Sequence, residues 1–195
     1  MISHISQCVF VHIPKCAGSS INQQLGLQSL GFSGHAPASY HIDYLKDYFS
    51  FTFVRDPYDR IASAYRYFQS LGVGHRWYKR NKIISDLASS LDFDGFIDHI
   101  PDFMKLMKRE EGSFESGIHF QPFDYFIDEP LDFIGRFENI QEDYAYILAR
   151  LGKRTQRLIK TNSTQPNYST IYTRDSRLKV YNLYREDFQK YKYPQ

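Results

Sequence analysis

A lysine and a run of small residues follow the first apolar segment of the chain, residues 8–13. The apolar segment predicts a short buried strand, which Pro14 ends, and a helical pattern begins near Ile21. A strand that passes through a small-residue loop into a helix presents backbone N–H groups and the positive end of the helix dipole to an anion. The segment therefore predicts a phosphate cradle formed by Lys15, Cys16, Ala17, Gly18, Ser19 and Ser20.

The order of residues in this cradle differs from the Walker pattern of ATP- and GTP-binding proteins. In G-x-x-x-x-G-K-[ST] the lysine follows the second glycine at the start of the helix, whereas Lys15 precedes Gly18. No Gly-Lys-Ser or Gly-Lys-Thr occurs in the chain. An ATP- or GTP-dependent phosphotransferase is therefore poorly supported. A plain strand–turn–helix with a solvated lysine is the alternative interpretation of the segment by itself.

Residues 50–65 repeat the same order of strand, polar turn and helix. Asp56 is a good N-cap, and Pro57 suits the first position of the helix. Arg55 lies at the C-terminal end of the strand, and Ser63 lies two helical turns beyond the cap. Because a guanidinium fork matches phosphate oxygens, these two side chains predict a second phosphate site. Two such sites at strand ends fit one ligand with a phosphate at each end.

The two segments resemble two motifs of the sulfotransferases that use 3′-phosphoadenosine 5′-phosphosulfate (PAPS). The resemblance is to the branch that contains Golgi carbohydrate sulfotransferases and their soluble bacterial relatives. Residues 12–20 are similar to its 5′-phosphosulfate loop, and residues 53–65 to its 3′-phosphate motif. Weaker similarity follows at residues 135–140 and 184–193, so the resemblance runs over nearly the whole chain.

The resemblance implies an enzyme that moves a sulfuryl group from PAPS to a carbohydrate hydroxyl by in-line displacement and releases 3′-phosphoadenosine 5′-phosphate (PAP). Lys15 would neutralise the leaving oxygens, a role for a preorganised cation. The cradle would hold the 5′-phosphate, while Arg55 and Ser63 would hold the 3′-phosphate. No metal ion is required. The Golgi enzymes are membrane-anchored, and the lack of a long apolar run in this chain departs from them and points to the soluble bacterial type. A binding module for PAP or PAPS without catalysis is the first alternative, and a P-loop-type kinase is the second.

Sulfuryl transfer needs a base for the proton of the acceptor hydroxyl, and histidine is the usual choice near neutral pH. His35 lies in residues 34–40, a loop between the first helix and the second strand, where similar relatives carry a histidine or an acid. It is the first candidate for the base, and its alternative is a loop histidine bonded to the backbone. His119 is the second candidate, or it positions the acceptor. His12 is expected to pack beside the cradle.

The composition is that of a globular protein with a single domain over residues 1–195. Hydrophobic residues make up 42% and charged residues 24% of the chain. A net charge of +2 gives no sign of a nucleic-acid partner. Basic residues cluster locally. Such a cluster is either a solvated helix face or a surface whose field attracts an anionic cofactor or an acidic glycan. One cluster contains Arg76, Lys79, Arg80 and Lys82.

Several features predict a cytoplasmic protein. No apolar run approaches the ~20 residues of a membrane-spanning helix. The first residues lack the basic start and apolar stretch of a signal peptide. Cys8 and Cys16 would be too far apart to bridge across an extended strand, and neither has a metal-ligand spacing. We therefore expect reduced cysteines and no metal site.

Strands that alternate with helices predict an α/β protein, and the resemblance implies a three-layer P-loop-like fold with a central parallel sheet flanked by helices. The strand order is not readable. A polar loop at 160–174 either covers the adenosine or is a plain connector. The expected strands are 8–13, 50–54, 125–127 and 133–137. The expected helices are 19–30, 57–70, 138–151 and 175–190, with a mostly helical insertion that extends to about 110.

Overall fold

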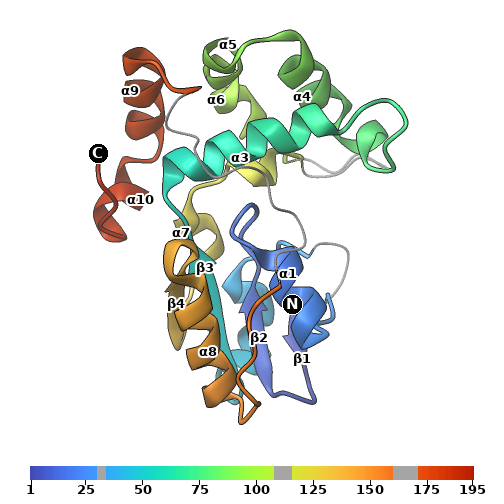
Figure 1. The fold of residues 1–195 in the computed structure, drawn as a ribbon, viewed down its shortest axis with the longest axis vertical. Helices are drawn as coiled ribbons and strands as arrows, with labels where there is room; N and C mark the ends of the chain where they lie inside the picture. The colour runs from blue at the N-terminus through green and yellow to red at the C-terminus, as the bar shows by residue number, and fades with distance from the viewer. Residues whose placement is uncertain (30–33, 108–115, 160–170) are drawn as a thin grey trace. The chain divides into compact units, whose positions relative to one another are not determined.

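The computed structural model describes residues 1–29, 34–107, 116–159 and 171–195 (Figure 1). The chain divides into two compact units. The first contains Met1–Arg55 and Pro122–Ser163, and the second contains Asp56–Gln121 and Thr164–Gln195. The single-domain organisation stays a prediction.

A four-stranded sheet forms the centre of the first unit. Its strands are β1 (Ile2–Ser3), β2 (Cys8–Val11), β3 (Phe49–Val54) and β4 (Phe133–Arg136), in the spatial order β1-β2-β3-β4. Strands β2, β3 and β4 are parallel, and β1 pairs antiparallel with β2. The α/β class with a mostly parallel sheet is therefore confirmed, whereas the short strand β1 was not expected from the sequence.

The central strands are apolar because both of their faces are covered. Every residue of β2 is buried, as is every residue of β3 after Phe49, which explains their nearly continuous hydrophobic sequences. The buried hydroxyl of Thr52 donates to the carbonyl of Val11 at 2.6 Å. A Cβ at Gly135 would lie 2.7 Å from the Phe53 ring, so only glycine lets β4 pack this closely against β3.

Two longer helices accompany this sheet, α1 (Gly18–Leu25) and α8 (Ile140–Arg150). Helix α8 is the helix expected over 138–151, and it packs against β4 (Figure 1). Helix α1 is shorter than expected because Gly26, with φ 61°, ends it in the left-handed conformation. The remaining helical segments of the unit are η1 (Ala38–His41), α2 (Ile42–Leu45), α7 (Phe123–Phe126) and η3 (Phe137–Asn139).

The strand expected over residues 125–127 is wrong. This segment instead belongs to helix α7 and the residue that ends it. Phe123 and Phe126 are buried whereas Tyr125 is partly exposed, so the apolar residues repeat with a spacing of three. That spacing fits one face of a helix and not the alternation of a strand.

The second unit is helical. It contains α3 (Pro57–Ser70), α4 (Tyr78–Ser90), α5 (Phe93–Asp98), α6 (Ile100–Phe103), η2 (Ser116–Phe120), α9 (Arg174–Leu183) and α10 (Arg185–Lys190). Helix α3 has the predicted bounds, and α4 to α6 confirm the helical insertion for residues 78–103.

The final helix expected over 175–190 is interrupted at Tyr184. This residue has φ −118° and ψ 27°, which separates α9 from α10. Its ring is buried, and its hydroxyl donates to the carbonyl of Phe120 at 2.7 Å. The chain therefore breaks its helix where a buried tyrosine is anchored to η2.

Two further expectations from the sequence concern a membrane span and the polar loop at 160–174. In the ranges that the structure describes, no helix combines the length and the apolar character needed to cross a membrane. Most of the polar loop expected at 160–174 lies outside the described residues, since the description ends at 159 and resumes at 171.

Candidate functional site

The loop between β2 and α1 has the backbone of an anion site. Lys15 and Ala17 both adopt the left-handed conformation, with φ 67° and 66°. Side chains with a Cβ adopt it at a cost of roughly 1–3 kcal/mol each, and such strain concentrates at functional sites. Within residues 1–29, Ala17 is the N-cap of α1, no side chain caps the helix and its first turn holds no acid. The positive end of α1 therefore suits an anion.

The two cations predicted from separate motifs are brought together in the first unit. Because β2 and β3 are parallel neighbours, their C-terminal ends lie side by side. Arg55 directly follows β3, and its Nη1 donates to the carbonyl of Lys15 at 3.2 Å. The guanidinium also lies 4.0 Å from the centroid of the Phe137 ring, and the side chain is buried. Arg55 is thus held rigidly against the cradle.

This proximity affects the charge of Lys15. Burial, and after it the positive charge of Arg55, lowers the pKa of Lys15 to about 8. Two cations held together in a partly buried site repel each other, and an anion bound between them would relieve that repulsion. The electrostatics of the cradle therefore favour an anionic ligand.

The other residues of the cradle differ in how far they are exposed to solvent. Cys16 and Ser20 are buried, whereas Ser19 is exposed. A Cβ at Gly18 would lie 1.8 Å from Cδ2 and Nε2 of His12, so the imidazole fills the space that a side chain would need. His12 also stacks on Phe10 with ring centroids 5.5 Å apart. His12 therefore packs beside the cradle, as expected.

His35 is fixed in one tautomer by the backbone. Its Nδ1 lies 2.9 Å from the carbonyl oxygen of His12. A carbonyl oxygen only accepts, so Nδ1 must carry the proton, and the neutral ring then has its lone pair on Nε2. This is the form that accepts a proton. The backbone bond of the alternative interpretation is thus present, and it also prepares the ring to act as a base.

Ser63 and His119 belong to the second unit. Ser63 is buried on α3, a helix that Asp56 caps by accepting from the N–H of Tyr58 at 2.8 Å. His119 lies in η2, and its ring stacks on Tyr67 with centroids 5.4 Å apart and an interplanar angle of 18°. It also meets Phe68 edge-on at 5.1 Å. An aromatic bracket therefore orients the imidazole of His119.

Sequence reasoning missed Arg60, which is completely buried. Its Nη2 donates to the carbonyls of His119 and Gln121, at 3.3 and 2.7 Å. Together with the Tyr184 hydroxyl on Phe120, it holds three consecutive carbonyls of the chain. A signal was available, because Arg60 lies four residues before Ala64 on the buried face of α3. Tyr184 therefore has a structural role in supporting η2, which accounts for the weak similarity to the family near this residue.

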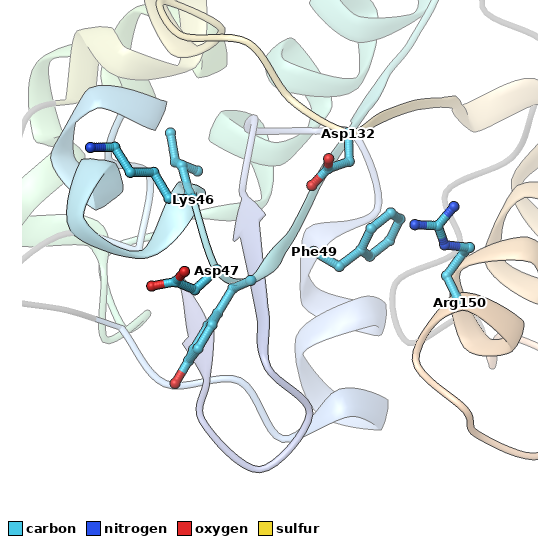
Figure 2. Close-up of a pocket in the computed structure, with 7 residues that line it drawn as sticks. Lys46, Asp47, Phe49, Asp132 and Arg150 are labelled. Atoms are coloured by element: carbon cyan, nitrogen blue, oxygen red, sulfur yellow. The ribbon is translucent and has the colours of Figure 1, made fainter.

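A surface pocket lies at the N-terminal end of β3, whereas Arg55 and the cradle lie at the C-terminal end of the sheet (Figure 2). Asp132 accepts from the backbone N–H and the hydroxyl of Ser50, at 2.7 and 2.9 Å. The guanidinium of Arg150 lies 5.2 Å from the centroid of the Phe49 ring. The pocket contains no predicted site residue, and its charged groups support the sheet. It measures about 220 Å³ and is lined by Leu45, Lys46, Asp47, Tyr48, Phe49, Asp132 and Arg150.

Across 1–29, 34–107, 116–159 and 171–195, no three acidic, histidine or cysteine side chains are grouped as a metal site would require. The metal-free chemistry expected from the sequence stays a prediction.

A parallel sheet with an anion-binding loop at the C-terminal ends of its strands is the arrangement of P-loop-like nucleotide-binding proteins. The chain belongs to the sulfotransferase family, whose model matches residues 1–194. Carbohydrate sulfotransferase 11 from Danio rerio is 26% identical over 174 residues, which cover 76% of this chain and 48% of that protein. The chain thus spans about half the length of this relative. No solved structure gives a significant match.

The lowered pKa of Lys15 predicts a pH-dependent stability. The ordinary value is 10.5, so between pH 8 and 10.5 the unfolded chain binds more protons at this position than the folded chain does. The free energy of unfolding should therefore rise with pH in this window, by about 1–3 kcal/mol at Lys15, given its partial exposure.

Urea denaturation at several pH values should show this rise in the wild type relative to Lys15→Met. Lys46→Met, which removes an exposed lysine of the same unit, should keep it. Parallel pH curves for wild type and Lys15→Met would contradict the prediction.

Proposed function

We propose that the protein transfers the sulfuryl group of PAPS to a hydroxyl of a carbohydrate acceptor and releases PAP. The observation that carries the proposal is the contact between Arg55 and the backbone of Lys15 at the ends of two adjacent parallel strands. The family supports the type of transfer, and the name of the Danio rerio relative supports the class of acceptor.

The first unit supplies groups for both ends of the donor. The cradle residues 15–20 hold the 5′-phosphosulfate at the N-terminus of α1, and Arg55 holds the 3′-phosphate. Ser63 keeps the role that its motif predicts, as a donor to the same phosphate. The 3′-phosphate takes no part in the reaction, but the energy of binding it orients the reacting end of the donor.

Lys15 and His35 divide the chemistry. PAPS supplies an activated sulfuryl group when it is bound. Nε2 of His35 takes the proton of the acceptor hydroxyl as the acceptor oxygen bonds to sulfur. The bond between sulfur and the bridging phosphate oxygen breaks, and the Lys15 ammonium neutralises the charge that develops on that oxygen. No metal ion is required for these steps.

A basic cluster of the second unit favours an acidic carbohydrate. The guanidinium carbons of Arg76 and Arg80 lie 4.8 and 5.2 Å from the centroid of the Trp77 ring. Both arginines are exposed, as is Lys79. The cluster stands at the N-terminal end of α4, where positive side chains destabilise a helix. Because Arg76 and Arg80 gain no stabilisation from the dipole at this end of α4, a role in binding anions explains their position better.

The same cluster adjoins His119. The charge of Arg76 is near enough to Tyr67 to act against the rise in the pKa of Tyr67 that burial causes. Tyr67 in turn stacks on the imidazole of His119. This continuity supports His119 as the residue that positions the acceptor, and it leaves His35 as the proposed base.

The proposed location is the cytoplasm. Cys8 and Cys16 are both buried, in β2 and in the cradle, and no disulfide joins them. Cysteines that form no disulfide are typical of proteins in a reducing compartment. This supports the location that the sequence predicts.

Transfer of label from PAPS carrying ³⁵S-sulfate tests the proposal. We expect label on an acidic polysaccharide with the wild type and at least a hundredfold less with Lys15→Ala, since a preorganised charge that stabilises a leaving group contributes roughly this much. Arg76→Gln/Arg80→Gln should raise KM for the acidic polysaccharide several-fold and leave kcat almost unchanged. The matched control Lys105→Gln/Lys179→Gln removes two cations of the same unit that are paired with Asp102 and Asp98.

The outcomes separate the alternatives. Stabilisation by PAP without any labelled product would indicate a binding module. Stabilisation by ATP and not by PAP would indicate a kinase. Equal transfer to neutral and acidic polysaccharides, with KM unchanged in the arginine variant, would remove the acidic acceptor from the proposal.

His35→Ala should abolish turnover and leave binding of PAP intact, because His35 acts on the acceptor proton and not on a phosphate. Isothermal titration with PAP measures the binding, and the label assay measures the turnover. His4→Ala removes an exposed histidine of the same unit and should change neither. Turnover of His35→Ala close to that of the wild type would transfer the role of base to His119.

A further inference from the structure

We propose that His12 is a positioning residue, which holds the ring of His35 in place beside the cradle. The inference rests on the proposed function, in which His35 is the base. It goes beyond the packing role that the sequence suggests for His12, because it couples the cradle to the proton-transfer step through one side chain.

The contacts of His12 reach both functional elements. Its carbonyl accepts the Nδ1 proton of His35 at 2.9 Å, and the two ring centroids are only 4.2 Å apart with an interplanar angle of 49°. The His12 ring also stacks on Phe10, on β2, with the ring centroids 5.5 Å apart. His12 therefore fixes His35 in two ways, by a backbone bond that sets the tautomer and by a ring contact that limits rotation.

The cradle is joined to this pair through Gly18. A Cβ there would lie 1.8 Å from Cδ2 and Nε2 and 2.6 Å from Cε1 of His12. The φ of Gly18 is not positive, so the backbone does not require glycine. The glycine is needed because the His12 ring occupies the position of a side chain. A movement of the first residue of α1 would therefore move His12, and with it His35.

Loss of the His12 ring should therefore affect turnover but not the binding of PAP. Phosphate binding depends on the backbone of the cradle, which His12→Ala retains. The position of Nε2 depends on the His12 ring, which His12→Ala removes. A misplacement of about 1 Å at a reacting group can cost roughly a hundredfold in rate. We therefore expect kcat to fall about ten- to hundredfold, while the Kd for PAP stays within about threefold.

Three variants test the coupling: His12→Ala, Gly18→Ala and the double variant. Gly18→Ala should lose turnover as His12→Ala does, because the new methyl group displaces the ring. In the double variant the methyl group has room, so its kcat should equal that of His12→Ala. This non-additivity is the signature of a shared contact.

A second measurement needs neither donor nor acceptor. In NMR spectra of the full chain with labelled histidine, the backbone bond should keep His35 in the Nδ1–H tautomer in both the wild type and His12→Ala. The order parameter of the His35 ring should fall in His12→Ala, because the ring contact that limits its rotation is lost. If His12→Ala melts below the assay temperature, His12→Leu replaces it, since leucine fills the space beside Phe10 without restoring the ring contact. The same loss of kcat is expected.

The proposal is overturned if His12→Ala keeps the wild-type kcat and the wild-type order parameter of the His35 ring. It is also overturned if the effects of His12→Ala and Gly18→Ala add in the double variant. A wild type that binds no PAP and transfers no sulfate would instead contradict the proposed function, and the order parameter of the His35 ring would still decide the role of His12.

Discussion

The parallel pairing of β2 with β3 is the constraint on which the site depends. It places the residues that follow the two strands at one edge of the sheet, so that Arg55 reaches the carbonyl of Lys15. The burial of both strands makes this register costly to change, because a shift of one residue would disrupt the close packing on both faces of the sheet. The charges of the cradle are thus positioned by the hydrophobic core below them.

The cradle itself is locally unfavourable. Two residues with a Cβ hold left-handed backbone conformations. Burial, and after it the charge of Arg55, lowers the pKa of Lys15 and so disfavours its charged form. The surrounding sheet supplies the stability that maintains this arrangement. A doubly phosphorylated ligand would neutralise the two cations, so the same features that weaken the free protein favour the complex.

The sequence predicted the segments in which local signals agree. The cap at Asp56, the proline after it and the apolar spacing all indicate α3, and its bounds are correct. The segment at 125–127 failed because a short aromatic run suits a strand or a helix, and only packing decides. The tautomer of His35 and the burial of Arg60 depend on carbonyls distant in sequence, at His12, His119 and Gln121, which no local pattern reveals. The roles of the site residues stay predictions.

Comparison of two ligands tests the central claim most directly. Calorimetric titration should show that the wild type binds PAP at least tenfold more tightly than adenosine 5′-phosphate, because a charge-assisted bond to the 3′-phosphate contributes about 1.5–3 kcal/mol. In Arg55→Ala this preference should nearly disappear, while the affinity for adenosine 5′-phosphate changes little. An undiminished preference in Arg55→Ala, or none in the wild type, would contradict the account.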